Sequence, residues 1–236
     1  MSNKGILYLI PTTIGDTPVA QVLPEYTLAV SKSLDTFIVE QLRTARRFLS
    51  KIKTPIPIDD MTFFPLNKHT ELKEVYSYLA PALEGKNIGL LSEAGTPCIA
   101  DPGSIIVEQA HLKGIQVIPL VGPNSIILAL MASGFNGQNF CFHGYIPIDQ
   151  NQRSKKLKEM EANVIKNDQT QIFIEAPYRN KQILDSICKT CSNKTKVCVA
   201  VDISLKTEYI RTKTVTEWKK SFPDFHKKPS IFLIYK

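Results

Sequence analysis

The sequence predicts an α/β protein made of two α/β domains, residues 1–120 and 121–236. Three observations lead to this fold class. Short apolar segments alternate with longer amphipathic segments through the first half, the pattern of a mostly parallel sheet whose strands are joined by helices. The segment Val121-Gly-Pro-Asn-Ser125 interrupts this alternation near the middle of the chain. The second half contains a predicted hairpin among its strands, so we expect a mixed sheet there.

In the first domain, four short apolar segments have the composition of buried strands: Gly5–Ile10, Thr36–Glu40, Ile88–Leu91 and Ile115–Leu120. Helical spacing of apolar residues predicts helices at Val19–Val30 with an interruption at Pro24, Gln41–Ile52, His69–Leu83 and Ile105–Lys113. Turn-forming residues at Pro11–Pro18 and a proline-rich stretch at Pro55–Phe64 predict connections.

The second domain is expected to begin with an apolar helix at Ile126–Ala132. Further helices are predicted at Arg153–Lys166 and Tyr178–Cys188. Strands are predicted at Phe140–Tyr145, Gln171–Glu175, Lys196–Val201 and Ile231–Tyr235, with a hairpin arm at Glu208–Thr216.

The composition is that of an ordinary globular protein, with 43% hydrophobic and 22% charged residues. No apolar run approaches the roughly 18–20 residues that cross a bilayer, and Met1–Lys4 leads directly into a strand. We therefore expect a cytoplasmic protein without a membrane segment. The five cysteines are scattered, and Cys188-Lys-Thr-Cys191 lacks a second ligand pair, so we expect reduced thiols and no metal site.

The charge is distributed unevenly along the chain. Residues 1–110 contain 10 Lys/Arg and 12 Asp/Glu, whereas residues 111–236 contain 19 and 10. A basic second half suits a polyanionic partner such as RNA. A solvated, lysine-rich surface without such a partner would explain the same excess of basic residues. The sequence leaves both interpretations open.

The most informative stretch is the end of the predicted strand Ile88–Leu91, which stops at Ser92-Glu-Ala-Gly-Thr-Pro97. Loops at the carboxyl ends of strands form the ligand crevices of open α/β sheets. This loop offers a carboxylate at Glu93, accessible backbone at Gly95 and a hydroxyl at Thr96, and it matches no phosphate-loop pattern. The stretch predicts a site for a small polar ligand.

Four motifs together resemble the tetrapyrrole methylase superfamily, the class III S-adenosylmethionine-dependent methyltransferases. They are Ser92-Glu-Ala-Gly-Thr-Pro97, Asp101-Pro-Gly103, Gly122-Pro-Asn-Ser125 and Glu175-Ala-Pro-Tyr-Arg179. The resemblance covers about Gly5 to Thr214 and is closest to the branch that methylates a cytidine 2′-hydroxyl in small-subunit ribosomal RNA. It implies a cofactor cleft between two domains, a homodimer and methyl transfer without a metal.

The resemblance also implies which residues bind S-adenosylmethionine. Glu93, Ala94, Gly95, Thr96 and Pro97 would contact the methionine part of the cofactor. Other residues would contribute backbone contacts or line the adenosine side: Ser125, Ile126, Ile174, Glu175, Ala200, Val201 and Pro229.

The chain departs from the branch pattern at two segments. Val39-Glu-Gln-Leu-Arg43 stands where the branch has Ala-Glu-Asp-Thr-Arg, and Asn67-Lys-His-Thr-Glu71 where it has His-Glu-His-Asn-Glu. Cofactor binding is therefore a firmer expectation than ribosomal RNA specificity. Two alternatives remain open: a methyltransferase acting on a tetrapyrrole or other small molecule, and a paralogue that binds the cofactor without catalysis.

Four residues are candidates for the reaction itself. Glu40 lies at the end of a predicted strand, where it can orient Arg43 or accept the proton of a hydroxyl. Arg43, with Arg46 and Arg47, can grip phosphates, or all three can belong to a solvated helix face. Glu175 and Arg179 can form a cleft-facing ion pair or contact the substrate.

Two other side chains have narrower roles. His69 is a candidate acid or base, or a surface residue near a helix start. Asp101 is expected to cap the helix that begins near Pro102.

Overall fold

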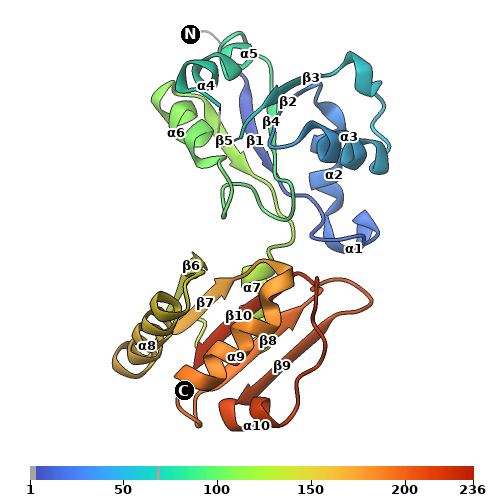
Figure 1. The fold of residues 1–236 in the computed structure, drawn as a ribbon. Coiled ribbons are helices and arrows are strands. Elements are labelled where there is room, and N and C mark those ends of the chain that lie inside the picture. The colour runs from blue at the N-terminus through green and yellow to red at the C-terminus, as the bar shows by residue number, and fades with distance from the viewer. Residues whose placement is uncertain (1–3, 68–69) are drawn as a thin grey trace. The chain divides into compact units, whose positions relative to one another are not determined.

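The computed structural model describes residues 4–67 and 70–236, so His69 lies outside the described residues. The chain divides into two compact units, Met1–Asn124 and Ser125–Lys236. Each unit has its own sheet and core, shown in blue to green and in green to red in Figure 1.

The first unit is built on a five-stranded parallel sheet with the order β3-β2-β4-β1-β5 (Figure 1). Its strands are β1 (Ile6–Ile10), β2 (Thr36–Val39), β3 (Thr62–Pro65), β4 (Ile88–Leu91) and β5 (Gln116–Pro119). β4 is in register with β1 at Leu9↔Leu90 and with β2 at Ile38↔Leu90. The parallel sheet expected for this half is confirmed, and the carboxyl ends of β1, β2 and β4 lie together.

The strand β3 corrects the sequence prediction, which assigned Pro55–Phe64 to a connection. A 3-10 helix at Ile58–Asp60 is followed by Thr62–Pro65, which pairs with β2 along its length. The prolines dominate the local pattern, but β3 is an edge strand, where a proline is tolerated at the end. Pairing with the buried strand β2, remote in sequence, decides the conformation.

The helices of the first unit are α1 (Val19–Val22), α2 (Glu25–Ser33), α3 (Leu42–Lys51), α4 (Leu72–Tyr78), α5 (Ala80–Leu83) and α6 (Ser104–Leu112). The expected interruption near Pro24 separates α1 from α2. The single helix predicted over 69–83 is divided instead, because Leu79 leaves helical geometry and Pro81 cannot donate a backbone hydrogen bond.

Both faces of the parallel sheet are covered. Leu90 and Ile88 pack with Val75, Leu79 and Ile106 from α4–α6. On the other face, Leu91 and Val39 pack with Leu49 from α3 and with Leu23. Neighbouring residues of one strand point to opposite cores, as the period of two requires.

The second unit contains a mixed sheet with the order β6-β7-β10-β8-β9, which confirms the expectation. Its strands are β6 (Phe140–Tyr145), β7 (Thr170–Ile174), β8 (Lys196–Val201), β9 (Tyr209–Thr214) and β10 (Ser230–Tyr235). β6 and β7 are parallel, and the other neighbours are antiparallel. The segment predicted as a hairpin arm, Glu208–Thr216, contributes β9, which forms an antiparallel hairpin with β8 along its whole length.

The helices of the second unit are α7 (Ser125–Ser133), α8 (Gln150–Asn167), α9 (Asn180–Thr190) and α10 (Val215–Lys220), with a 3-10 turn at Pro177–Arg179. Trp218 of α10 packs with residues of α8, α9 and the sheet in one core. Helix α10 is absent from the elements predicted from the sequence, although Thr214 and Glu217 form a capping box at its start.

All five cysteines are free, and Cys188 and Cys191 are buried. None of the helices formed by the described residues combines the length and apolar character that crossing a bilayer requires.

Candidate functional site

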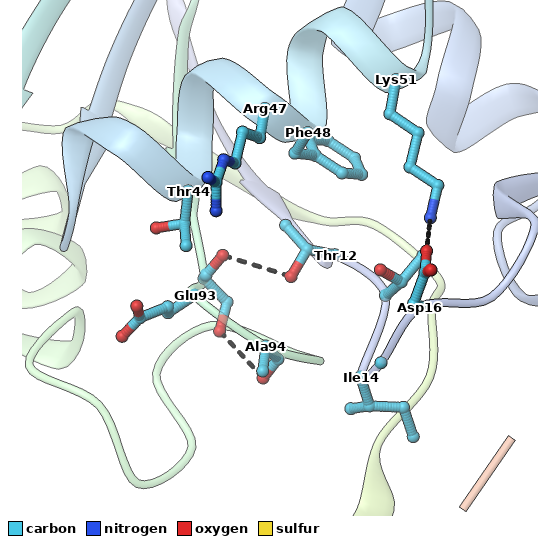
Figure 2. A pocket seen from close by; sticks show the side chains of 12 residues that line it. Thr12, Ile14, Asp16, Thr44, Arg47, Phe48, Lys51, Glu93 and Ala94 are labelled. Atoms are coloured by element: carbon cyan, nitrogen blue, oxygen red, sulfur yellow. Dashed lines mark hydrogen bonds and ion pairs between the residues drawn. The ribbon is translucent and has the colours of Figure 1, made fainter. Parts of the chain in front are cut away.

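A pocket of about 440 Å³ opens at the carboxyl ends of β1, β2 and β4 (Figure 2). Its volume falls in the range of small-molecule sites, about 300–1,000 Å³. Three segments form its walls: Thr12–Asp16 after β1, the helix α3 that follows β2, and Ser92–Ala94 after β4. The order of the strands explains the position. The chain leaves β2 toward one edge of the sheet and leaves β4 toward the other, so a crevice opens where their connections diverge.

The loops after β1 and β4 are joined by hydrogen bonds. The backbone N–H of Thr12 donates to the carbonyl of Gly95 at 2.9 Å, and its Oγ1 donates to the carbonyl of Ser92 at 3.2 Å. The hydroxyl of Ser92 donates to the carbonyl of Ala94 at 3.2 Å (Figure 2). These bonds fix the turn and leave Glu93 and Ala94 exposed at the mouth of the pocket.

Gly95 is required by its backbone geometry. Its φ is +75°, and a Cβ there would lie 3.1 Å from both Ile14 Cγ2 and the carbonyl oxygen of Pro123. The following residue, Thr96, accepts a hydrogen bond from the side-chain amide of Asn124 at 2.6 Å, and Pro97 is buried. The glycine therefore lets the loop after β4 contact the loops after β1 and β5 at once.

We expect Gly95→Ala to introduce about 1–2 kcal/mol of backbone strain, and more if the two neighbours cannot move. If the loop relieves that strain by leaving its present conformation, affinity for S-adenosylmethionine, the ligand that the family resemblance predicts here, falls by about tenfold or more. Calorimetric titration with S-adenosylmethionine, together with urea unfolding, measures both effects. Gly134→Ala is the matched control, because Gly134 has the same φ of +75° and nothing within 4 Å of the added Cβ. Equal cofactor affinity in both variants would contradict this role of Gly95.

Asp101 holds the rest of the loop. Its Oδ1 accepts hydrogen bonds from the N–H groups of Cys98 at 2.8 Å and Gly103 at 2.9 Å. Cys98 and Ala100 both have positive φ, so the carboxylate stabilises a strained turn immediately before α6. Burial, with the charge of Asp101, raises the pKa of the Cys98 thiol to about 11, so the thiol stays protonated at neutral pH.

Helix α3 presents a polar stripe to the pocket, formed by Thr44, Arg47 and Lys51 (Figure 2). Lys51 is neutralised by Asp16, whose Oδ1 lies 2.9 Å from its Nζ, and it also donates to the carbonyl of Thr17. Arg47 and Arg43 are exposed and make no hydrogen bond or ion pair with the described residues. Arg46 is bound to Asp59 instead, so the structure separates the three predicted arginines into two accessible guanidinium groups and one paired group.

Glu40 lies between β2 and α3 and is half-buried. Burial raises the pKa of its carboxyl above the ordinary glutamate value, and the charges of Glu93 and Asp101 raise it further. The structure therefore groups three carboxylates at this end of the sheet. A carboxylate with a raised pKa is a better proton acceptor than an ordinary one.

Glu175 and Arg179 form a buried ion pair in the second unit. Arg179 Nη2 lies 3.1 Å from Glu175 Oε2, and the two side chains are only 9% and 2% exposed. The other carboxylate oxygen of Glu175 accepts the N–H of Ala176 at 2.8 Å. The Nε of Arg179 has no hydrogen-bond partner among the described residues. Of the two roles predicted for the pair, the structure supports the ion pair; a role on the substrate stays a prediction.

The remaining predicted cofactor residues also lie in the second unit. Ser125 is the first residue of α7, and Ile126, the next, is buried. At one end of the mixed sheet, Ile231 of β10 is in register with both Ile174 and Ala200, and Val201 follows. Pro229 accepts a hydrogen bond from the N–H of Asp202 at 3.0 Å at the same end. The fold therefore brings Ile174, Ala200, Val201 and Pro229 together; their cofactor contact stays a prediction.

Two parts of the pocket were not predicted from the sequence: the wall after β1, from Thr12 to Asp16, and Lys51 of α3. The sequence does contain a pattern that predicts a ligand loop after β1: the apolar run Ile6–Ile10 ends at a loop containing Gly and Pro, just as Ile88–Leu91 does. In the part of the chain that the structure describes, no group of three or more His, Cys, Asp or Glu side chains is arranged to hold a metal ion.

Comparison with known proteins relates this chain to methyltransferases. Residues 20–219 match the family model for tetrapyrrole (corrin/porphyrin) methylases. The ribosomal RNA small subunit methyltransferase I of Pasteurella multocida is 32% identical over 240 residues, covering 99% of this chain and 80% of that protein. The protein of the same name from Bacillus subtilis is 34% identical over 218 residues, covering 92% and 70%.

Solved structures show the same fold at lower identity. The methyltransferase CobJ matches with a TM-score of 0.65 and 16% identity, over 98% of this chain and 94% of its own. A uroporphyrin-III-C-methyltransferase from Thermus thermophilus matches with a TM-score of 0.55, also at 16% identity, over 98% and 92%.

Proposed function

The chain belongs to the tetrapyrrole methylase family, and from this membership we propose that it methylates small-subunit ribosomal RNA. It is an S-adenosylmethionine-dependent methyltransferase, as the family and its methyltransferase-named relatives establish. The observation that carries the choice of acceptor is the similarity, at about 30% identity over nearly the whole chain, to proteins named ribosomal RNA small subunit methyltransferase I.

The residues of the first unit fit the proposed cofactor. S-adenosylmethionine supplies an electrophilic methyl group on a positively charged sulfur. The loop Glu93–Pro97 offers an exposed carboxylate at Glu93 that complements a small, positively charged ligand, followed by the exposed Ala94, and the buried Gly95 keeps side-chain atoms out of that turn. We assign the methionine part of the cofactor to this loop.

The proposed acceptor is a cytidine 2′-hydroxyl, and Glu40 is the proposed proton acceptor for it. Its raised pKa and its position at the strand ends support this role. Arg43 and Arg47 carry accessible guanidinium groups, which we assign to the phosphates that flank the target nucleotide. The charge of the second unit supports a polyanionic acceptor, since Ser125–Lys236 contains 18 Lys/Arg and 10 Asp/Glu.

Radiolabelled methyl transfer tests the proposal. Purified small ribosomal subunits and their unmethylated RNA are incubated with the protein and S-adenosylmethionine that carries a labelled methyl group. We expect label in the RNA, within a dinucleotide that resists alkaline hydrolysis, because a 2′-O-methyl group blocks cleavage at its linkage. Label on a tetrapyrrole acceptor in place of RNA would replace the proposed substrate. Cofactor binding without transfer to either would support a non-catalytic paralogue.

We also propose that the protein acts in the cytoplasm as a homodimer, which the family resemblance suggests. Light scattering coupled to size-exclusion chromatography tests the assembly, with an expected mass of twice that of the 26.5 kDa chain.

A further inference from the structure

Helix α8 contains a buried arginine that has no carboxylate partner. Arg153 is 2% exposed, and no Asp or Glu of the described residues lies within ion-pair distance of it. Its Nη1 donates to the carbonyl of Ile148 at 2.6 Å and more weakly to that of Pro147, and its Nε donates to the hydroxyl of Ser186 at 3.0 Å. A buried cation that meets only neutral acceptors is costly, because its charge stays uncompensated.

The guanidinium group is not fully used by these contacts. Its Nη2 makes no hydrogen bond to any described residue. Arg153 also lines a pocket of about 200 Å³ between α8 and α9, two helices that pack against each other in the second unit (Figure 1). A charged, buried side chain therefore has a spare donor where the surface is hollowed.

The other side chains of this pocket are polar. Gln150 and Ser154 come from the first turns of α8, and Gln182 and Lys189 come from α9. One acidic residue, Asp185, lies among them, so the lining carries two cations and one anion. The pocket is smaller than the roughly 300 Å³ at which sites for whole small molecules begin, so it suits a single anionic group.

A purely structural role explains part of this arrangement. Arg153 ties the segment Pro147–Ile148 to α9, which accounts for its Nε and Nη1 contacts. This role leaves two groups on the lining of the same pocket free to bind a ligand: Nη2 of Arg153, which is not among the fully enclosed unpaired atoms, and the exposed Lys189. An anion with several acceptor oxygens would satisfy both and compensate the buried charge.

We propose that the pocket between α8 and α9 binds a backbone phosphate of RNA. This inference rests on the proposed function only in taking RNA as the polyanion. Arg153 supplies the fixed donor, Lys189 supplies the second charge, and Asp185 limits the affinity so that the strand can be released.

Fluorescence anisotropy of a labelled single-stranded RNA decamer, measured at several salt concentrations, tests the pocket. Lys189→Glu should weaken binding several-fold and lower the slope of log K against log salt by about 0.7, the value for one phosphate contact on a single strand. Lys166→Glu is the matched control, because it makes the same charge change at an exposed position in the last turn of α8. Equal effects of the two variants, or no RNA binding by the unaltered protein, would overturn the proposal.

Asp185→Asn is expected to change RNA affinity in the opposite direction. Because unfolding can only weaken RNA binding, a tighter complex cannot result from a loss of folding. Removing the one acidic group from the pocket should tighten RNA binding, whereas unchanged or weaker binding counts against the site. Titration of the ¹⁵N-labelled protein with inorganic phosphate should shift amide signals within residues 150–154 and 182–190, and the absence of these shifts contradicts a phosphate site. RNA binding that depends on Lys189, without methyl transfer to RNA, would uphold the pocket and reject the proposed function.

Discussion

Replacement of Glu40 by glutamine is expected to lower kcat for methyl transfer by about 100-fold or more, in the range that positioned acid–base groups contribute. Glutamine preserves the size and the polar contacts of the side chain but cannot accept a proton. The KM for S-adenosylmethionine should change little, because the loop after β4 is the segment assigned to the cofactor. Single-turnover methyl transfer measures the effect, with Glu84→Gln as a control at an exposed position after α5. A variant that keeps the full rate would remove Glu40 from the reaction.

The pH dependence follows from the same carboxyl group. Only its deprotonated form accepts a proton, so activity should rise with pH through the pKa of Glu40. Burial, then the charges of Glu93 and Asp101, place that pKa above the ordinary glutamate value. Asp101→Asn keeps the Oδ1 acceptor for Cys98 and Gly103 but removes one negative charge. The acid limb of its pH–rate profile should therefore move to lower pH, and a limb that stays in place would show that another group titrates.

The second large effect is expected from Arg179→Met, which should destabilise the second unit by about 3–5 kcal/mol. The substitution leaves the carboxylate of Glu175 buried at 2% exposure without its counter-charge. Trp218 is the single tryptophan of the chain and is fully buried in the same unit, so its fluorescence reports the unfolding of that unit in urea. Loss of less than about 1 kcal/mol would show that Glu175 finds another partner.

The double variant Glu175→Leu/Arg179→Met separates the two causes of that loss. Because it removes both charges, it should recover much of the stability that the single change costs. Methyl transfer is then measured on the double variant at a temperature where it is folded. A rate near that of the unaltered protein would assign the pair to folding, whereas a large loss of kcat would support the catalytic role predicted from the sequence.

Local sequence determined much of the fold and of the candidate site. The apolar run Ile88–Leu91 that ends at Ser92 predicts both the strand β4 and the ligand loop after it. The glycine within that loop is explained by a local property, its φ of +75°. The alternation of strands and helices predicts the parallel sheet, because burial on both faces and short connections leave few other arrangements. The family resemblance, which also depends on short contiguous motifs, is confirmed by the family model and the relatives.

The tertiary structure decided what depends on residues far apart in the chain. β3 is a strand because β2 pairs with it, although Pro55 and Pro57 before it and Pro65 at its end disfavour that conformation. The wall at Thr12–Asp16 joins the site because β1 lies beside β4. The pKa of Glu40 is raised first by burial and then by the charges of Glu93 and Asp101, which follow a different strand. Arg153 appears in the sequence as one more basic residue of a lysine-rich helix, and only the packing of α8 against α9 buries it. Pairing, burial and electrostatic fields arise from neighbours in space, so a linear pattern cannot specify them.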